Sequence, residues 1–311
     1  MKKIDLKAYA KINLCLDVKG LLPGGFHEVE MIMQQILLCD DVSMAWEPDA
    51  DGEFNIELRT NRNFLPTDER NLAYKAALLM KDEFGEKAGG GNLRIFIKKR
   101  IPVAAGLAGG SSNGAAVLHG LNVLWDLNLS VAELNEVGAK LGSDVPFCIM
   151  GQAAETLALK KRFRKDPLAC HCALATGRGT DLKPLTGLRS HLVLSKPAVS
   201  VSTAEVYRGI DNEEIPERPN VQEMIEALKI QDMDSVEKNM INVLENFTLK
   251  RYPIVVYTKD KMQSKCNPAG VLMSGSGPTV FGLCGSIDES KRICREMEEE
   301  NRESFWTRTT Y

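Results

Sequence analysis

Alternating apolar and polar positions near the start of the chain predict a β-strand. From Ala8 to Leu16 the even positions are apolar, whereas Lys11 and Asn13 stand at odd positions. Because successive side chains of a strand point to opposite faces, this period of two predicts a half-buried strand with Lys11 and Asn13 on one face. A turn at Pro23-Gly24-Gly25 and a mixed apolar run through Leu38 predict a second strand.

Apolar spacing then changes to the helical period. Leu72, Ala76 and Leu79 recur at helical intervals, and Ser130 with Glu133 has the spacing of a capping box, which is typical of a helix start. The predicted elements are a helix from about Asn71 to Phe84 after start signals at Thr67 and Asp68, an alternating strand around Leu93 to Ile97, a helix from Gly114 to Leu127, and a helix from Ser130 to Gly142.

The composition becomes more polar from Lys160 to Lys165, which predicts a domain boundary there. Beyond it, strand-like runs alternate with helix-like runs. We expect strands at Leu192–Leu194, Gly270–Met273 and Thr279–Leu283, and helices at Val221–Leu228, Met233–Asn246 and Asp288–Glu299. The mixture predicts an α+β fold with two domains, residues 1–160 and 161–311.

Composition and charge exclude several classes of protein. With 311 residues, 44% of them hydrophobic, and a net charge of -3, the chain is long enough for two cores. Its 39 basic and 42 acidic residues are interspersed, which argues against a nucleic-acid partner. The eight cysteines include no Cys-x-x-Cys pair, so we expect reduced thiols without disulfides or a zinc site. Because no signal core or membrane-spanning run is found, we expect a cytoplasmic protein without a membrane partner.

A glycine-rich segment, Gly106-Leu107-Ala108-Gly109-Gly110-Ser111-Ser112, follows a strand-like run that ends at Pro102 and precedes the helix from Gly114. Glycines let the backbone approach an anion, and the N–H groups and positive dipole end of a helix bind phosphate. This layout predicts a nucleotide-binding loop. No lysine follows the last glycine, which excludes a Walker-type loop, and Asp126 closes a helix, which excludes a dinucleotide-binding fingerprint. A flexible turn without a ligand is the alternative.

Three segments together resemble the motifs of the superfamily of galactose, homoserine, mevalonate and phosphomevalonate kinases (GHMP kinases). They are Lys11-Ile12-Asn13-Leu14, Pro102-x-x-x-Gly106-Leu107-x-Gly109-Gly110-Ser111-Ser112 and Ser274-Gly275-Ser276-Gly277-Pro278-Thr279. Within the superfamily, the forms Ala10-Lys11-Ile12-Asn13-Leu14, Gly25-Phe26-His27-Glu28, the glycine-rich segment and Gly142-Ser143-Asp144-Val145-Pro146-Phe147 resemble the 4-diphosphocytidyl-2-C-methyl-D-erythritol kinase family. The match keeps the order of the motifs from Lys11 to about Leu283.

The resemblance implies an ATP-dependent kinase that phosphorylates the 2-hydroxyl of a cytidylyl methylerythritol intermediate in the non-mevalonate (methylerythritol phosphate) route to isoprenoid precursors. It implies a two-domain GHMP kinase fold, with an N-terminal domain like ribosomal protein S5 domain 2, a ferredoxin-like C-terminal domain and substrates in the cleft between them. We expect magnesium to arrive with ATP, because no acidic cluster is spaced as a dedicated metal site. The expected assembly is a monomer or homodimer. Rival interpretations are another GHMP kinase, of homoserine or mevalonate type, and a nucleotide-binding regulator without catalysis.

By resemblance, Asp144 is the catalytic base and Lys11 acts with it. Phosphoryl transfer needs a group that accepts the hydroxyl proton as the attacking oxygen approaches the γ-phosphorus. A nearby cation would keep Asp144 ionised, lower the pKa of the substrate hydroxyl and offset charge on the phosphoryl oxygens. The alternatives are a turn or cap residue at Asp144 and a solvated lysine on an exposed strand face at Lys11.

The resemblance places ATP-binding residues in the phosphate loop and on the adenosine side of the nucleotide. The loop residues are Pro102, Ala104, Ala105, Gly106, Leu107, Ala108, Gly109, Gly110, Ser111 and Ser112. Asn71 and Lys99 line the adenosine side, although Lys99, between Lys98 and Arg100, is also typical of a solvated charge. We expect Ser112 to cap the helix and to turn its hydroxyl toward phosphate or magnesium.

The implied substrate-binding residues are Asn13, Phe26, His27, Thr203 and Tyr207. Phe26 and Tyr207 would form two walls of a cytosine slot, with His27 hydrogen-bonded to the base; the alternative is an exposed aromatic in a local cluster. Stacking of a base on an aromatic ring contributes about 1–3 kcal/mol. The family usually has Pro-Asp-Gly-Tyr-His where this chain has Pro23-Gly24-Gly25-Phe26-His27, and Asn113 stands where aspartate is common.

Overall fold

A computed structural model describes residues 1–49, 52–267 and 270–311, which form two compact units. Unit 1 consists of Met1–Ala10, Leu38–Ile101 and Ala108–Cys170, and unit 2 consists of Lys11–Leu37, Pro102–Leu107 and His171–Tyr311. Two long paired strands, β1 (Lys2–Leu22) and β2 (Phe26–Pro48), contribute residues to both units. The division into sequence domains 1–160 and 161–311 stays a prediction.

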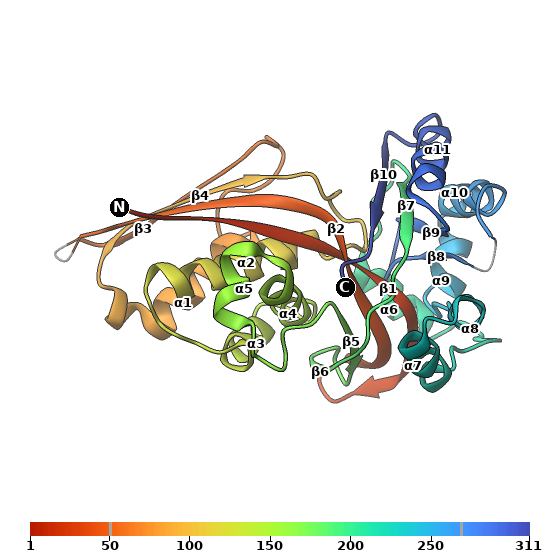
Figure 1. The fold of residues 1–311 in the computed structure, drawn as a ribbon, viewed down its shortest axis with the longest axis horizontal. Coiled ribbons are helices and arrows are strands. Elements are labelled where there is room, and N and C mark those ends of the chain that lie inside the picture. Colours follow the sequence, from red (N-terminus) through yellow and green to blue (C-terminus); the bar gives the residue numbers. More distant parts are fainter. Residues whose placement is uncertain (50–51, 268–269) are drawn as a thin grey trace. The chain divides into compact units, whose positions relative to one another are not determined.

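In unit 1, a sheet is covered by helices. β4 pairs in parallel with β3 and antiparallel with β2, so that Ile95 lies opposite Leu58 on β3 and Met44 on β2. Alternate residues of β4 are buried, as the sequence predicts, and the helices lie along one face of β3 and β4 (Figure 1). The elements are β3 (Phe54–Thr60), β4 (Gly91–Lys98), α1 (Leu72–Ala88), α2 (Gly109–Leu124), α3 (Val131–Ala139), α4 (Val145–Glu155) and α5 (Leu157–Phe163).

The helices predicted in unit 1 are present, but one of them begins at a different residue from the one predicted. Ser130 and Glu133 form the reciprocal capping box of α3. Asn71 is the N-cap of α1, and its side chain accepts a hydrogen bond from the Ala73 amide. The helix expected from Gly114 begins earlier, at Gly109, because the glycine-rich segment itself supplies its first turn.

In unit 2, β2 pairs antiparallel with β5, which pairs with β6, and a second antiparallel sheet has the order β10-β7-β9-β8. α11 buries Ser290, Ile293, Cys294 and Met297 at helical spacing. These residues face the second sheet, since α11 contacts β7 and β10 (Figure 1). The elements are β5 (Cys172–Thr176), β6 (Asp181–Pro184), β7 (His191–Lys196), β8 (Val271–Met273), β9 (Val280–Cys284), β10 (Glu303–Arg308), α6 (Thr203–Ile210), α7 (Val221–Ile230), α8 (Met233–Lys238), α9 (Glu245–Arg251), α10 (Pro253–Gln263) and α11 (Ile287–Glu298).

Two predictions about secondary structure are wrong in detail. β1 is buried on both faces from Ala8 to Val18, so the strand is not half-buried. The helix expected over Met233–Asn246 is divided into α8 and α9. The intervening segment pairs with β1, where the Leu16 amide donates to the Ile241 carbonyl and the Val243 amide donates to the Leu16 carbonyl. A long-range backbone partner therefore overrides the local helical spacing.

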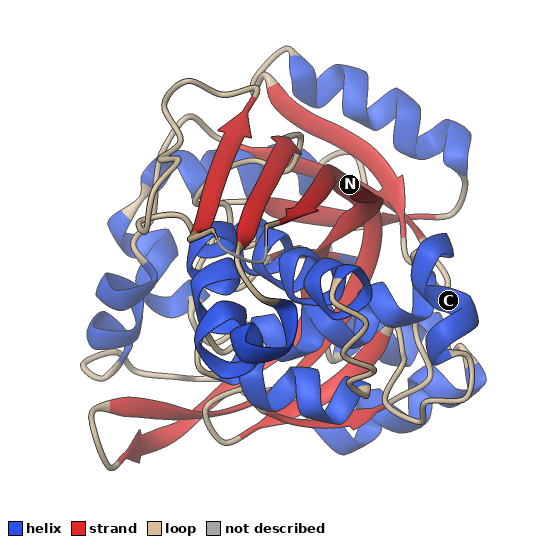
Figure 2. Cartoon of the chain, turned by 90° about the vertical axis from the view of Figure 1, so that its left-hand side faces the viewer, coloured by secondary structure: helices blue, strands red, loops and turns tan. Residues whose placement is uncertain are grey.

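The chain contains many helices and many strands, which confirms the α+β class (Figure 2, helices blue and strands red). No disulfide joins any of the eight cysteines, all of which lie among the described residues, and six of them are buried. Within the part of the chain that the structure describes, no helix has the length and apolar composition needed to cross a membrane.

Candidate active site

In unit 1, the phosphate loop ends in the first turn of α2. The N-cap is Ala108, whose φ of 55° lies in the left-handed region that alanine rarely adopts. Ser112 N makes the first intrahelical bond, to the Ala108 carbonyl at 2.8 Å, so the N–H groups of Gly109, Gly110 and Ser111 have no partner within the helix. Gly110 is exposed and Ser111 half-buried. This turn is arranged to bind an anion.

Lys99 is buried in unit 1, which excludes the alternative of a solvated charge. Its side chain is 6% exposed, and its Nζ donates to Asp40 Oδ2 at 2.5 Å. A Cβ on Gly109 would come within 2.7 Å of Lys99 Nζ, so the ammonium lies beside the first residue of α2. Burial lowers the pKa of Lys99, and the charge of Asp40 opposes that shift.

Asp40, which the sequence analysis did not single out, organises this region. Its carboxylate also accepts hydrogen bonds from Asn113 Nδ2 at 2.8 Å and from the backbone amides of Arg100 and Ile101 at 2.6 and 2.8 Å. Asn113, noted for standing where aspartate is common, thus supplies a donor that a second carboxylate would lack. The only available signal was a pair of aspartates, Asp40-Asp41, next to an apolar run.

Ser112 does not cap α2, contrary to expectation. It is the fourth residue of the helix and fully buried, and its hydroxyl donates to the Tyr9 carbonyl at 2.7 Å. Gln152 Nε2 donates to the same hydroxyl at 3.1 Å and to the Ser112 carbonyl at 2.8 Å. In this arrangement Ser112 packs α2 against β1 and α4.

Asn71 combines two local roles at the start of α1. Its Oδ1 accepts from the Ala73 amide at 3.0 Å, and its Nδ2 donates to the Pro66 carbonyl at 2.8 Å. The side chain is therefore held in one orientation, with one further donor and one further lone pair left for a ligand.

Asp144 stands at the N-terminus of α4 and is partly exposed. Its side chain makes no N-cap hydrogen bond, so the alternative of a capping residue is not supported. The first turn of α4 contains Pro146, which favours a helix start, and the Cys148 amide donates the first intrahelical bond to the Asp144 carbonyl at 3.2 Å.

In unit 2, Lys11 and Asn13 lie on the same face of β1, as the alternation predicts. Lys11 Nζ donates to Asn13 Oδ1 at 2.7 Å, and the two residues are 4% and 0% exposed. A Cβ on Gly275 would lie 3.4 Å from Lys11 Nζ, from Asn13 Oδ1 and from the Gly106 carbonyl oxygen. The first motif (residues 11–14), the phosphate loop (residues 102–112) and the third motif (residues 274–279) therefore meet around Gly275 in this unit.

The phosphate loop and the third motif are in close backbone contact. Gly106 has φ of 73°, and a Cβ there would come within 2.1 Å of the Ser274 carbonyl oxygen, while Ser274 Oγ donates to the Gly106 carbonyl at 3.0 Å. Ala104 is also left-handed, with φ of 50°, and the Lys11 amide donates to the Leu107 carbonyl at 3.2 Å. Pro102, Ala105 and Leu107 are buried, whereas Ala104 is exposed. Only glycine fits at position 106.

The residues expected to bind a cytosine also lie in unit 2. The rings of His27 and Tyr207 are 5.2 Å apart, and His27 Nε2 lies 2.8 Å from Asp211 Oδ1. Phe26 is 45% exposed and lies beneath the Arg178 guanidinium. Thr203 is exposed, and its hydroxyl lies 2.9 Å from the hydroxyl of Ser276 in the third motif.

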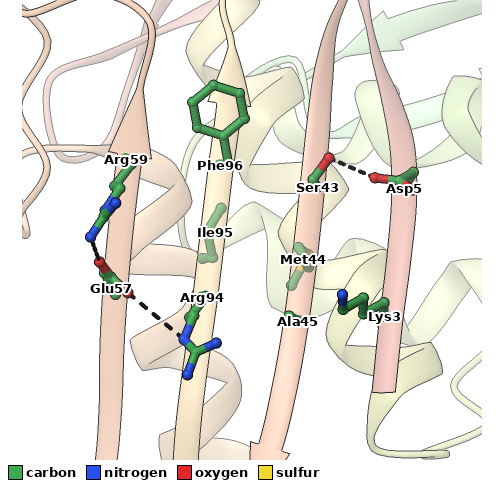
Figure 3. A pocket seen from close by; sticks show the side chains of 10 residues that line it. All are labelled: Lys3, Asp5, Ser43, Met44, Ala45, Glu57, Arg59, Arg94, Ile95 and Phe96. Atoms are coloured by element: carbon green, nitrogen blue, oxygen red, sulfur yellow. Dashed lines mark hydrogen bonds and ion pairs between the residues drawn. The ribbon is translucent and has the colours of Figure 1, made fainter. Parts of the chain in front are cut away.

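A pocket of about 640 Å³ lies on the strands of unit 1, but it contains none of the expected site residues. Its charged side chains are largely paired, since Asp5 accepts from Ser43 at 2.6 Å and Glu57 pairs with Arg59 and Arg94 (Figure 3). Among the described residues, no group of three or more His, Cys, Asp or Glu side chains is placed to hold a metal ion. In unit 1 the first turn of α2, and in unit 2 the residues around Gly275, are therefore better candidates for functional sites.

The chain matches two family models, "GHMP kinases N terminal domain" over residues 71–152 and "GHMP kinases C terminal" over residues 224–303. Solved structures agree with this fold. The crystal structure of a 4-(cytidine 5'-diphospho)-2C-methyl-D-erythritol kinase matches with a TM-score of 0.77 and 29% identity, covering 99% of this chain and all of that one. Homoserine kinase from Cytophaga hutchinsonii matches with a TM-score of 0.69 and 17% identity over 100% of this chain and 95% of its own. The predicted two-domain GHMP kinase fold is confirmed.

Relatives in bacteria are closer in sequence. A 4-diphosphocytidyl-2-C-methyl-D-erythritol kinase of Alkaliphilus metalliredigens is 46% identical over 94% of this chain and 91% of its own length. One of Bacillus pumilus is 48% identical over 92% of this chain and 90% of its own. The chain therefore belongs to the GHMP kinase superfamily and, within it, to the 4-diphosphocytidyl-2-C-methyl-D-erythritol kinase family.

Proposed function

We propose that this protein transfers the γ-phosphoryl group of ATP to the 2-hydroxyl of 4-diphosphocytidyl-2-C-methyl-D-erythritol, in the cytoplasm and as a monomer or homodimer. The observation that carries the proposal is the 43–48% identity to relatives of this name over 92–99% of this chain. Lys11 and Asp144 stand in segments that resemble the motifs of the family. The transfer is a step of the methylerythritol phosphate route to isoprenoid precursors.

The chemistry assigned to Lys11 and Asp144 follows from what the transfer requires. The hydroxyl oxygen becomes a better nucleophile as its proton passes to a base, and the partly exposed Asp144 carboxylate is the proposed acceptor. The Lys11 ammonium, held by Asn13 at 2.7 Å, supplies positive charge for the oxygens that gain negative charge during the transfer. Because Lys11 is buried, its charge is weakly screened by water.

The proposed triphosphate site uses backbone groups more than side chains. The N–H groups of Gly109, Gly110 and Ser111 would bind phosphate oxygens, whereas Asn71 and Lys99 would line the adenosine side of the nucleotide. The close approach of Gly106 to Ser274, which leaves no room for a Cβ, holds the loop against the segment Ser274-Gly275-Ser276-Gly277. Magnesium would be bound by the phosphates and by the partly exposed Ser111 hydroxyl, where it would neutralise charge on the β- and γ-oxygens.

The proposed cytidine site is built from rings and hydrogen-bonding groups of unit 2. Phe26 and Tyr207 offer ring faces for the cytosine, and His27, fixed by Asp211, is placed beside Tyr207. Stacking of this kind contributes about 1–3 kcal/mol, which favours a cytidylyl substrate over homoserine or mevalonate. Thr203 and Asn13 are the proposed polar contacts to the rest of the substrate.

A coupled assay tests the proposal. The purified protein with ATP and magnesium should turn over 4-diphosphocytidyl-2-C-methyl-D-erythritol with kcat/KM far above that for homoserine or mevalonate. Preference for either of those alcohols would assign the chain to another GHMP activity. ATP binding with no turnover of any of the three alcohols would favour a nucleotide-binding regulator.

A further inference from the structure

Arg178 lies in the turn between β5 and β6 and covers the ring of Phe26. Its Cζ is 3.5 Å from the ring centroid, which is stacking distance. The residues on either side, Gly177 and Gly179, have φ of 63° and 89°, and the Gly177 carbonyl accepts from the Val29 amide on β2 at 2.8 Å. The turn is thus tied to the strand that carries Phe26, so the placement of Arg178 is built into the backbone.

The charge of Arg178 has no acidic partner among residues 1–49, 52–267 and 270–311, and the side chain is exposed. Three other arginines of unit 2 do form ion pairs: Arg218 with Asp17, Arg251 with Glu205 and Arg292 with Glu296. An exposed guanidinium on an aromatic ring is held only weakly, by a small cation–π attraction. A stronger anionic ligand would therefore draw it away from Phe26.

The turn before Phe26 offers Arg178 no acidic side chain. Pro23-Gly24-Gly25 carries no carboxylate, and a Cβ on Gly24 would point at the Phe26 ring, 3.7 Å from its nearest carbon. An acidic side chain at position 24 would therefore lie beside the ring that Arg178 covers. With glycine at position 24, no carboxylate from this turn competes with a ligand for the N–H groups of the Arg178 guanidinium.

We propose that Arg178 binds the diphosphate of the cytidylyl substrate and rests on Phe26 when that substrate is absent. The inference rests on the proposed function, which places the cytosine against Phe26. The planar guanidinium matches two phosphate oxygens at once, and a charge-assisted pair of this kind changes affinity by roughly 10- to 100-fold. The cytosine and the guanidinium compete for one face of the ring, so the base itself gains nothing from Arg178.

Binding of cytidine and of CDP to the full-length protein, measured by calorimetry, tests this assignment. In Arg178→Gln, CDP affinity should fall by about 10- to 100-fold while cytidine affinity stays equal or rises. Arg189→Gln is the matched control, because Arg189 is also exposed and stacked on an aromatic ring, Tyr311, with Cζ 5.0 Å from the centroid. It should leave both affinities unchanged.

Two further variants probe the charge at this turn. Arg178→Lys should recover part of the CDP affinity, since it keeps the charge but not the planar fork. Gly24→Asp should weaken CDP binding more than the isosteric Gly24→Asn, because only aspartate pairs with Arg178. In steady-state assays Arg178→Gln should raise KM for the cytidylyl substrate and leave KM for ATP unchanged.

Equal losses for cytidine and CDP in Arg178→Gln would overturn the inference and assign Arg178 to the base or to the placement of Phe26. An unchanged CDP affinity would overturn it as well. Either result in the variant is compatible with turnover of the cytidylyl substrate by the wild-type protein, so neither counts against the proposed function. A wild-type protein that neither binds CDP nor turns over that substrate would instead count against the proposed function.

Discussion

Lys99 Nζ lies 2.5 Å from Asp40 Oδ2 in the interior of unit 1, where the lysine side chain is 6% exposed and the aspartate side chain 0%. The same carboxylate holds Asn113 of α2 and the amides of Arg100 and Ile101 after β4. One buried charge therefore ties the end of a strand to the helix that begins the phosphate site.

Replacing Asp40 by Asn should lower the free energy of unfolding by about 3–5 kcal/mol, because it leaves the Lys99 charge buried without its partner. Asp41→Asn, at the neighbouring and more exposed position, should cost less than about 1 kcal/mol. Urea unfolding of the three proteins measures both values. Equal effects at the two positions would refute a special role of Asp40.

Gly106→Ala should reduce kcat/KM for ATP by on the order of 100-fold, since small displacements at a catalytic site have effects of this size. The added Cβ would come within 2.1 Å of the Ser274 carbonyl oxygen at a φ of 73°, so the loop has to shift. Gly20→Ala is the control, because no atom of the described residues lies within 4 Å of a Cβ at that position. Wild-type kinetics in Gly106→Ala would show that the close approach is dispensable.

Lys11→Met and Asp144→Asn should each lower kcat by about 100- to 10,000-fold, the range for loss of a general base or of electrostatic stabilisation. ATP affinity should change only a few-fold, because neither residue belongs to the proposed triphosphate site. Lys98→Met, at an exposed position, serves as the control. A large loss of ATP binding without a fall in kcat would assign these residues to nucleotide binding.

His119 should make the protein less stable in mild acid. It is fully buried on α2, its Nε2 lies 3.0 Å from the Ile149 carbonyl, and burial lowers its pKa to about 4. In the unfolded chain the pKa of this imidazole is near 6.5, so the unfolded state binds the proton first as the pH falls. The free energy of unfolding is therefore highest above pH 6.5 and decreases as the pH drops toward 4. The expected loss from this residue is about 3 kcal/mol.

His119→Gln removes that titration, so its unfolding free energy should vary less between pH 7 and pH 4 than that of the wild type. Urea unfolding at a series of pH values gives the difference between the two curves. Parallel curves would show that the buried imidazole does not titrate in this range.

Local sequence signals were enough to predict the elements that are defined by the spacing of apolar and capping residues within the element itself. The alternation of Leu93, Ile95 and Ile97 gives β4, the Ser130 capping box opens α3, and the placement of Lys11 beside Asn13 follows from the strand period. The order of the motifs indicated the family. These features depend on residues that are near each other in the chain.

What sequence reasoning missed depends on distant partners. β1 is buried on both faces, and the break between α8 and α9 follows from backbone bonds to Leu16. Asp40 is distinguished by its four hydrogen-bond donors, which come from residues 59 to 73 positions away. Arg178 is distinguished by its contact with Phe26, about 150 positions earlier. No window of neighbouring residues contains such information.

The product formed from γ-labelled ATP and 4-diphosphocytidyl-2-C-methyl-D-erythritol, identified by phosphorus NMR and mass spectrometry, shows directly whether the protein is this kinase. The wild type should place the labelled phosphoryl group on the 2-hydroxyl, and Asp144→Asn should form the same product at a rate lower by about 100-fold or more. Label found only in inorganic phosphate would rule out the proposed kinase reaction, and a wild-type rate in Asp144→Asn would rule out Asp144 as its base.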